Sequence, residues 1–198
     1  MPEPNYRTLR YVLHPDTHWN NVGDFADTLG WPLAHEITRN QTEGTDGQMI
    51  WQSPSGISLH YVVDATSGIG YVTLAGPDEE SVAPFTAQAH KELTPWSLEE
   101  LFQRFDGEVD PIERGRLTLR IGLAAPPELN HGCLTRILSS LAGDDPRIRL
   151  AGLWATTYTG YQEFVPTVRE LAQGDPENWL RTRAESVVAA FEDAGGKP

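Results

Sequence analysis

The segment His14-Pro15-Asp16-Thr17-His18 carries two imidazoles and one carboxylate within five residues, and zinc sites draw on such groups. The surrounding pattern predicts that a strand ends at His14 and that a helix begins with Asp16 or Thr17 as its N-cap. His18 would then lie in the first helical turn, and the Asp16 carboxylate would bond to the backbone. Because this geometry opposes joint ligation, we interpret the segment as structural and predict no metal site.

Two other histidines could take part in general acid–base chemistry. His35 and His60 fall in expected strands, and Glu36 adjoins His35. Such chemistry needs an imidazole and a carboxylate within hydrogen-bond reach around a cleft. The aromatic side chains that could complete this cleft are Trp31, Trp51 and Tyr61. A pocket containing His35, Trp51 and His60 therefore supports one alternative function, a small-molecule enzyme or ligand-binding protein.

Signatures of other catalytic sites are absent from the sequence. Gly68-Ile69-Gly70 lacks the third glycine and the following helix of a phosphate-binding loop, and no Gly-x-Ser-x-Gly nucleophile elbow occurs. Cys133 lies in an expected helix among apolar residues, where a buried and unreactive thiol is typical. We therefore assign no catalytic residues, metal or cofactor, and we favour a non-catalytic protein.

The composition is that of a globular protein. A chain of 198 residues, of which 39% are hydrophobic, can bury one large core or two small ones. The single cysteine excludes an internal disulfide framework, and the first ten residues, MPEPNYRTLR, have no apolar core of a signal peptide. No apolar run is long enough to cross a bilayer. We therefore expect a cytoplasmic protein that does not bind membranes.

The charge of the chain distinguishes between classes of partner. It has 28 acidic and 15 basic residues, which gives a formal net charge of -13. Nucleic-acid binding normally requires a basic surface, so phosphate backbones would be repelled. A basic protein partner would be attracted, although acidity can also serve solubility alone. Residues 1–94 hold 12 acidic and 4 basic residues, and residues 95–198 hold 16 acidic and 11 basic residues. The charge of the first part is therefore the more one-sided.

Short alternating segments in the first part of the chain predict strands. The expected strands are Arg7–His14, Leu33–Asn40, Gln48–Gln52, Ile57–Val63 and Gly70–Ala75. Apolar spacings of three and four residues predict one helix that ends at Gly30 and another from Asp78 to Leu93. The order β-α-β-β-β-β-α is typical of a mainly antiparallel sheet with helices on one face, which predicts an α+β domain over residues 1–94.

Residues 95–198 have the pattern of helices separated by Asp-Pro pairs. Ser97 and Glu100 have the spacing of a capping box. Three Asp-Pro pairs, each with Asp suited to the N-cap and Pro to the first helical residue, are Asp110-Pro111, Asp145-Pro146 and Asp175-Pro176. The apolar-Arg pairs that follow them, at intervals of 29 and 32 residues, are Leu119-Arg120, Ile148-Arg149 and Leu180-Arg181. Second helices are expected over about residues 129–141 and 161–172, so a period near thirty residues predicts an α-helical repeat domain.

These segments resemble HEAT-type repeats. The segment DDPRIRLAGLWA from Asp144 resembles the first helix of such a repeat, DPENWLRTRAESVVAAF from Asp175 resembles it again, and DPIERGRLTLRIGLAA from Asp110 is a looser match. The resemblance covers about residues 97–194. It implies two to three HEAT-like repeats, with an irregular helical bundle as the alternative, and an extended helical face that binds proteins. We expect the repeat arginines to bond to neighbouring carboxylates such as those of the capping Asp residues.

A second resemblance concerns the first part of the chain. The segment MIWQSPSGISLHYV from Met49 resembles the hairpin of a vicinal-oxygen-chelate, or glyoxalase-like, module, and the order of elements is similar. An active member of that superfamily would need metal ligands from paired modules, and no matching set can be placed here. A ferredoxin-like sheet explains the pattern equally well. The resemblance therefore implies a fold for residues 1–94 without an activity.

Aromatic residues gather around one expected turn between repeat helices. Trp154, Tyr158 and Tyr161 lie there, and Trp179 lies in the next repeat. Most are expected in the core between stacked helices, and any that are exposed would be strong anchors for a partner. We therefore predict a protein that binds another, basic protein and occludes it, as a bacterial-type immunity, inhibitor or adaptor protein would. Mimicry of nucleic acid ranks last, because the acids lie mostly at helix starts.

Overall fold

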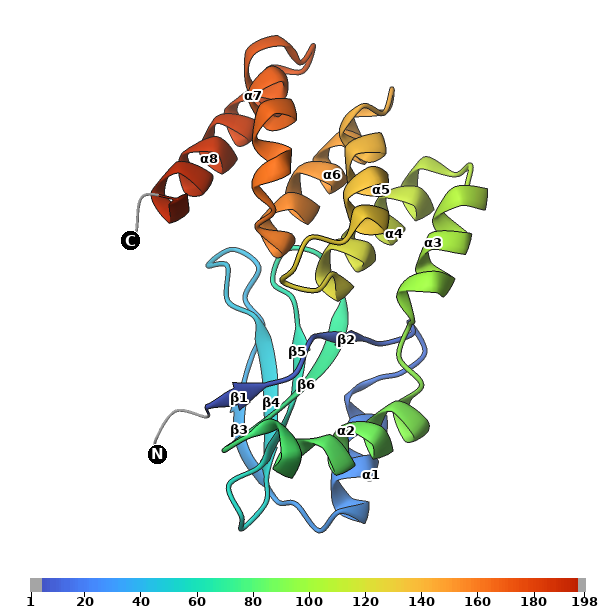
Figure 1. The fold of residues 1–198 in the computed structure, drawn as a ribbon, viewed down its shortest axis with the longest axis vertical. Helices are drawn as coiled ribbons and strands as arrows, with labels where there is room; N and C mark the ends of the chain where they lie inside the picture. Colours follow the sequence, from blue (N-terminus) through green and yellow to red (C-terminus); the bar gives the residue numbers. More distant parts are fainter. Residues whose placement is uncertain (1–4, 196–198) are drawn as a thin grey trace. The chain divides into compact units, whose positions relative to one another are not determined.

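All strands of the described residues lie in the first part of the chain, and the later part is helical (Figure 1). The computed structural model describes residues 5–195. The chain divides between Trp96 and Ser97 into two compact units, which we call the sheet unit and the helical unit. Within the described range, the sheet unit holds six strands and two helices, and the helical unit holds six α-helices and one short 3-10 helix. This confirms the predicted α+β class, in which an antiparallel sheet is followed by helices.

One antiparallel sheet organises the sheet unit. Its strands lie in the order β1-β6-β5-β4-β3, and β2 also pairs with β6. The strands are β1 (Tyr6–Arg7), β2 (Tyr11–Val12), β3 (Leu33–Ile37), β4 (Gly47–Gln52), β5 (Ser58–Val63) and β6 (Gly70–Gly76). Strand β3 pairs with β4, β4 with β5 and β5 with β6, so β3 forms one outer edge of the sheet.

The first predicted strand is divided into β1 and β2 by Thr8. The backbone N–H of Thr8 donates to Leu74 O at 2.9 Å, and its hydroxyl oxygen accepts from Leu74 N at 3.0 Å. A side chain thus replaces a backbone acceptor at this point of the ladder. The prediction of one continuous strand over Arg7–His14 is therefore wrong.

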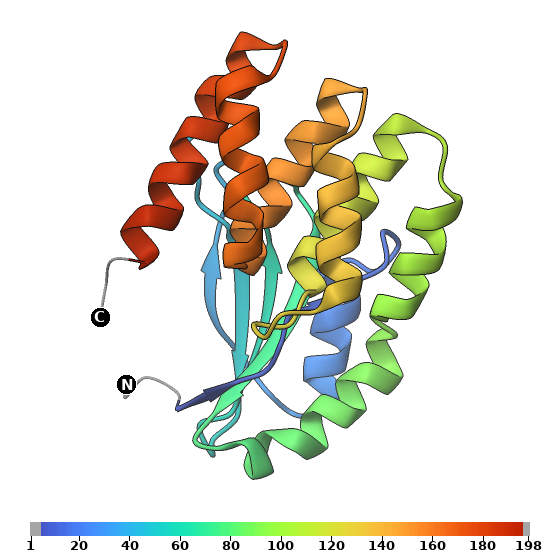
Figure 2. The same ribbon diagram turned by 45° about the horizontal axis from the view of Figure 1, so that its top comes forward.

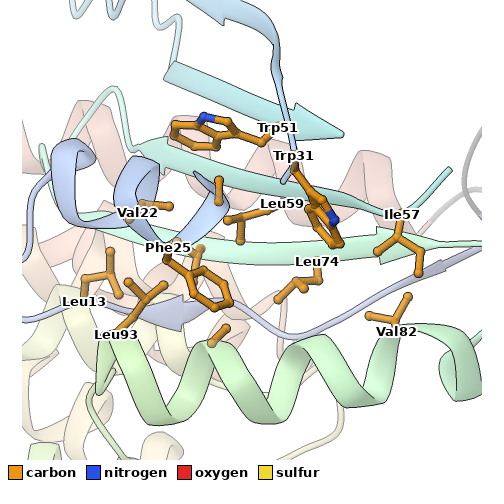
Figure 3. Close-up of a cluster of buried hydrophobic side chains, with 13 residues drawn as sticks. Leu13, Val22, Phe25, Trp31, Trp51, Ile57, Leu59, Leu74, Val82 and Leu93 are labelled. Carbon is orange, nitrogen blue, oxygen red and sulfur yellow. The ribbon is translucent and has the colours of Figure 1, made fainter. Parts of the chain in front are cut away.

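Helices α1 (Trp19–Thr28) and α2 (Glu79–Leu93) pack on one face of the sheet. A continuous apolar core lies between these helices and the strands (Figure 3). Phe25 of α1, Trp51 of β4 and Leu74 of β6 are all buried in it. Burial of such a side chain contributes about 1.5–3 kcal/mol, so this cluster is sufficient to hold both helices on the sheet.

The caps of the two helices differ in how well the sequence predicts them. Asp78 caps α2 as expected, because its Oδ1 accepts from Ser81 N at 2.8 Å. Helix α1 begins later than expected, with His18 as its N-cap in place of Asp16 or Thr17. The backbone N–H of His18 donates to the Asn21 side-chain oxygen at 2.9 Å. This is the bond that the third residue of a helix makes back to the N-cap residue in a capping box.

Three antiparallel helix pairs make up the helical unit (Figure 2). The helices are α3 (Leu98–Gly107), α4 (Pro111–Ala124), α5 (His131–Leu141), α6 (Pro146–Thr159), α7 (Val165–Gly174) and α8 (Asn178–Gly195), with a 3-10 helix (Gln162–Phe164) before α7. Helix α3 packs on α4, α5 on α6 and α7 on α8, and α4 also packs closely on α6. The two helices of each pair are joined by a short turn that contains an Asp-Pro motif. The last helix, α8, therefore pairs with α7, which precedes it in the chain.

Two of the three Asp-Pro pairs start a helix as predicted. The Asp110 carboxylate caps α4 by accepting from the N–H groups of Ile112 and Glu113 at 2.9 and 3.0 Å. The Asp145 carboxylate caps α6 by accepting from Arg147 N at 2.8 Å. In both helices Pro is the first helical residue, where its missing N–H is not needed.

Small residues let α4 and α6 approach each other closely. A Cβ added to Gly122 would lie 2.8 Å from the Ala155 Cβ and 3.0 Å from the Ala155 O. One added to Gly115 would lie 3.5 Å from the Ala151 Cβ. The two glycines are seven residues apart, two helical turns, so they form one side of a seam between the helices. This seam is the central packing contact of the helical unit.

Candidate functional site

The three residues of the predicted pocket do not share one face of the sheet. Trp51 is in register with Leu59 and lies in the core beneath α1 and α2. His35 and His60 are in register with Ile50, one from each neighbouring strand. Because side chains alternate faces along a strand, Ile50 and both histidines lie on the face opposite to Trp51. The structure therefore does not bring the three residues together, and Ile50 separates the two histidines.

His60 is held by neighbours on its own face of the sheet. Its Nε2 lies 2.8 Å from Ser58 Oγ, and its Nδ1 lies 3.1 Å from Gln48 Nε2. Burial, together with the nearby charge of Arg7, lowers the pKa of His60 to about 4. At neutral pH the ring is therefore uncharged and both nitrogens are occupied. This arrangement supports a structural role better than that of a general base, which works best with a pKa near the operating pH.

His35 does not form an acid–base pair with its sequence neighbour. It lies on β3, all of whose residues are exposed. His35 is in register with Ile50, whereas Glu36 is in register with Met49. Neighbouring residues of a strand direct their side chains to opposite faces. The adjacency of His35 and Glu36 in the sequence therefore does not place them in one site.

The remaining candidate residues for chemistry serve the fold. The His14 ring stacks on Trp96 with centroids 3.8 Å apart, and His18 caps α1. Over residues 5–195, no three His, Cys, Asp or Glu side chains are grouped so that they could hold a metal ion. Cys133 is buried as predicted, and desolvation raises the pKa of its thiol to about 11. A thiol with so high a pKa is a core residue and a poor nucleophile.

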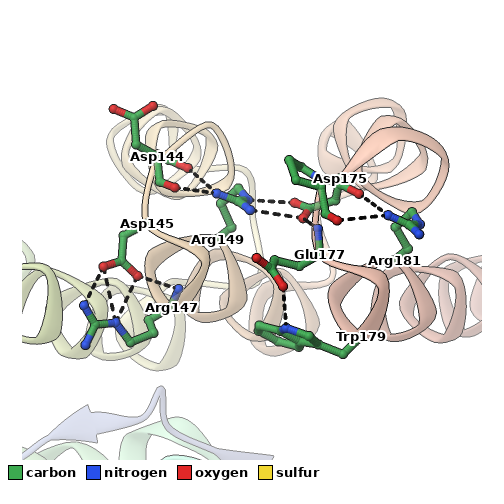
Figure 4. Close-up of polar contacts among 10 residues, drawn as sticks. Asp144, Asp145, Arg147, Arg149, Asp175, Glu177, Trp179 and Arg181 are labelled. Carbon is green, nitrogen blue, oxygen red and sulfur yellow. Dashed lines mark hydrogen bonds and ion pairs between the residues drawn. The ribbon is translucent and has the colours of Figure 1, made fainter.

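Arg149 connects the turns of two helix pairs (Figure 4). Its Nε and Nη2 donate to the Asp175 carboxylate at 2.6 and 3.0 Å, and its Nη1 donates to the backbone oxygens of Gly143 and Asp144 at 2.9 and 2.8 Å. The Arg149 and Asp175 side chains are only 11% and 2% exposed. The expected bond between a repeat arginine and an Asp of the Asp-Pro motif is therefore confirmed here, in a buried bidentate pair.

The third Asp-Pro motif, which holds this pair, departs from the other two. Burial raises the pKa of Asp175, but bonds from Arg149 and from Glu177 N outweigh it and hold the pKa below its usual value. Glu177 N donates to Asp175 Oδ1 at 2.8 Å, and α8 begins only at Asn178. The prediction that Pro176 is the first helical residue is therefore wrong, because the first backbone oxygen that accepts from α8 is that of Glu177, from Leu180 N and Arg181 N at 3.0 and 3.1 Å.

Arginines at equivalent positions close all three turns. Each lies near the start of the second helix of its pair and donates through Nη1 to a backbone oxygen of the preceding turn. The bonds are Arg114 to Glu108 O at 3.1 Å, Arg149 to Gly143 O at 2.9 Å and Arg181 to Pro176 O at 3.3 Å. The intervals are 35 and 32 residues, from 114 to 149 and from 149 to 181. Arg120, the predicted first member, lies further along α4, where its buried Nε has no hydrogen-bond partner within the described residues.

Tyr161 belongs to the core and is not a surface anchor. It is buried, and its ring stacks on Phe164 with centroids 5.9 Å apart. Its hydroxyl lies 2.7 and 2.9 Å from the backbone oxygens of Pro126 and Glu128, and it accepts from Asn130 N at 3.3 Å. Tyr161 therefore fastens the connection between α4 and α5, in line with the expectation that most of these aromatics are core residues.

Trp154, Trp179 and Arg183 form a patch on α6 and α8, which we call the tryptophan surface. The guanidinium carbon of Arg183 lies 5.8 Å from the centroid of the Trp154 ring. Trp179 is one helical turn before Arg183 and 42% exposed, and its indole N–H donates to Glu177 Oε2 at 3.1 Å. Tyr158, one turn after Trp154 on α6, is half-buried. Aromatic rings with a polar rim are the typical anchors of a protein interface.

Sequence patterns did not distinguish a second group of exposed apolar side chains. Trp19, at the start of α1, is 53% exposed. Leu33 and Ile37, at the two ends of β3, are 47% and 46% exposed. The alternating pattern identifies β3 as a strand, but whether a strand lies at the edge of a sheet depends on the order of pairing, which no local pattern specifies.

Comparisons of the chain with protein-family models, with curated proteins and with solved structures found no match. None of the described helices is both long and apolar enough to cross a membrane.

Proposed function

We propose that the protein is a non-catalytic binding module that engages a basic protein partner, in the manner of an immunity, inhibitor or adaptor protein. Its action would be occlusion of the partner's surface. The single observation that carries the proposal is the tryptophan surface, because Trp179 keeps 42% of its area exposed. Large exposed aromatic side chains are costly in water and gain the most when a partner covers them.

The charge of the chain supports a basic partner. The formal net charge of -13 produces an attractive field for a cationic protein and a repulsive one for phosphate backbones. Such a field mainly increases the rate of encounter and decreases with salt, whereas buried aromatic anchors supply affinity. The two features therefore have separate roles in one binding reaction.

We further infer that the helical unit is built of HEAT-like repeats. Three helix pairs, with Arg114, Arg149 and Arg181 closing successive turns, support this inference. In stacked repeats, each unit contacts mainly its neighbours and the row of helices offers an extended face. The tryptophan surface lies on α6 and α8, the second helices of two consecutive pairs, and would be part of such a face.

Capture of partners from the native cell, followed by a binding measurement with the purified partner, tests the proposal. We expect one stoichiometric, basic protein to be captured at low salt. Trp179→Ala should then raise the Kd at least tenfold, since truncation of an interface anchor costs about 2 kcal/mol or more. Raising the salt concentration should slow association more than it speeds dissociation.

Trp19→Ala provides the matched control for this experiment. Trp19 is also a tryptophan near the start of a helix and is 53% exposed, but it belongs to the sheet unit, whereas the tryptophan surface belongs to the helical unit. Its replacement should change the Kd less than twofold. Capture of no stoichiometric partner at low salt would count against the proposed function, and equal effects of both substitutions would count against the tryptophan surface as its site.

A further inference from the structure

Strand β3 presents a free edge of the sheet. It pairs with β4 on one side, and within residues 5–195 no strand pairs with it on the other. In an antiparallel ladder, backbone N–H and C=O groups point alternately to the two sides of a strand, so half of those on β3 point outward. All five residues are exposed, including Leu33 and Ile37. This edge therefore offers both hydrogen-bonding groups and apolar surface to an added strand.

The usual protection of an edge strand is incomplete here. Native edges are commonly blocked by lysine, proline or a bulge. Strand β3 contains neither lysine nor proline. A register shift between Leu33 and His35 disturbs its first part, whereas His35–Ile37 pairs regularly with Ile50–Gln48. The regular part of the edge is thus centred on Glu36.

Charge decides which occupant suits this edge. A second copy of the chain would bring together two molecules that each carry a net charge of -13, and the sequence of the sheet unit, residues 1–96, has 12 acidic and only 4 basic residues. Self-pairing is therefore opposed by repulsion, which can replace the missing lysine as protection against aggregation. The same field attracts a cationic segment.

We propose that the outer edge of β3 binds an extended, cationic segment of the protein partner by addition of a strand to the sheet. The inference rests on the proposed function, because the partner is taken to be a basic protein. Glu36 is in register with Met49 and Ile37 with Gln48, so these two residues lie on opposite faces. The added strand would place Lys or Arg beside Glu36 and an apolar, β-branched residue beside Ile37, since cross-strand neighbours favour such pairs.

A labelled heptapeptide of alternating lysine and valine is the probe for this edge. We expect saturable binding by fluorescence anisotropy and slower amide exchange in residues 33–37 by hydrogen-exchange mass spectrometry. Glu36→Lys should raise the Kd at least fivefold. Glu43→Lys, which makes the same charge change in the turn between β3 and β4, should raise it less than twofold. A heptapeptide with N-methyl groups on every backbone nitrogen should not bind, because neither of its edges then has N–H donors.

Several results would overturn the proposal. The first two are absence of heptapeptide binding at millimolar concentration and slower amide exchange only in residues outside 33–37. The other two are equal increases in Kd for Glu36→Lys and Glu43→Lys and unimpaired binding of the N-methylated heptapeptide. Equal thermal unfolding midpoints of the two variants establish that both are folded.

The captured partner separates this inference from the proposed function. If Trp179→Ala weakens binding of the partner but Glu36→Lys and Ile37→Lys do not, the protein is a binding module and strand addition is wrong. If no partner is captured although the heptapeptide protects β3, the edge binds cationic strands and the proposed function fails. The two failures thus give different results.

Discussion

The sheet unit and the helical unit distribute their functional side chains in different ways. In the sheet unit, residues close in the sequence are separated, as Trp51 and Ile50 are on opposite faces of β4. In the helical unit, residues more than thirty positions apart perform the same task, as Arg149 and Arg181 do in successive turns. Strand alternation divides neighbours, whereas stacked helix pairs repeat one environment. A local pattern therefore identifies equivalent residues more reliably in the helical unit.

The largest expected effect comes from the buried ion pair of the helical unit. Asp175→Asn would leave Arg149, 11% exposed, without its charged partner. Removal of one member of a buried pair costs about 3–5 kcal/mol. We expect a loss of this size in the free energy of unfolding of the helical unit at pH 7. Urea unfolding followed by hydrogen exchange measures it, because exchange resolves the two units.

The exposed pair of Arg169 and Glu192 serves as the control for this change. The side chains of Arg169 and Glu192 are 51% and 59% exposed, and Arg169 Nη2 lies 2.8 Å from Glu192 Oε1. Glu192→Gln should cost less than about 1 kcal/mol, because exposed pairs contribute little. Equal costs for Asp175→Asn and Glu192→Gln would show that Arg149 is not the link between the turns.

The sheet unit should respond most strongly to acid through His60. The folded-state pKa of His60 is about 4, below its ordinary value of 6.5. As the pH falls below 6.5, the unfolded chain therefore takes up the proton first, and stability is lost until about pH 4. The loss is at most about 3 kcal/mol. Unfolding free energies measured at several pH values between 7 and 4 should show this slope in the native protein.

His60→Gln should remove that slope, and His35→Gln should leave it intact. The two histidines are in register with the same residue, Ile50, but His35 lies on exposed β3 whereas His60 is buried. An unchanged pH dependence in His60→Gln would mean that the ring is solvated in the folded protein. The comparison tests directly whether the two histidines have separate environments.

Several features of the fold follow from local sequence patterns. Ser97 and Glu100 form the predicted capping box, with bonds of 2.9 Å from Ser97 N to Glu100 Oε2 and 3.2 Å from Glu100 N to Ser97 Oγ. Asp78 and Asp145 cap helices where expected. These contacts span two or three residues, so the groups that must meet are already close in the sequence. The α+β class was predictable for the same reason.

Other features depend on contacts between distant residues, and the sequence pattern misjudges them. Arg120 follows Leu119 just as Arg149 follows Ile148, but Arg114 is the residue that reaches the backbone of its turn. The residues predicted to line one pocket, His35, Trp51 and His60, do not share one face of the sheet for a related reason. The faces of His35 and Trp51 depend on strand pairing and on the register shift in β3, neither of which leaves a local signal.

The seam between α4 and α6 gives a smaller effect. Gly122→Ala would place a Cβ 2.8 Å from the Ala155 Cβ and 3.0 Å from its backbone oxygen. We expect a cost of about 2 kcal/mol, because overpacking forces the helices apart. Gly174→Ala, at the end of α7, meets nothing within 4 Å and should be neutral or stabilising by up to about 1 kcal/mol. Urea unfolding measures both, and a cost for Gly122→Ala without one for Gly174→Ala would confirm that the close approach of α4 and α6 depends on Gly122.

The smallest expected effect compares two predicted N-caps. The sequence pattern gives Asp16 and Asp110 the same role, but only Asp110 accepts bonds from the first turn of a helix, at 2.9 and 3.0 Å. Asp110→Ala should therefore cost about 1 kcal/mol, the usual value of a lost cap. Asp16→Ala should change the free energy of unfolding by less than about 0.5 kcal/mol, because α1 begins after His18. Equal costs would restore Asp16 as the cap of α1 and would mean that the sheet unit follows its local sequence pattern as closely as the helical unit does.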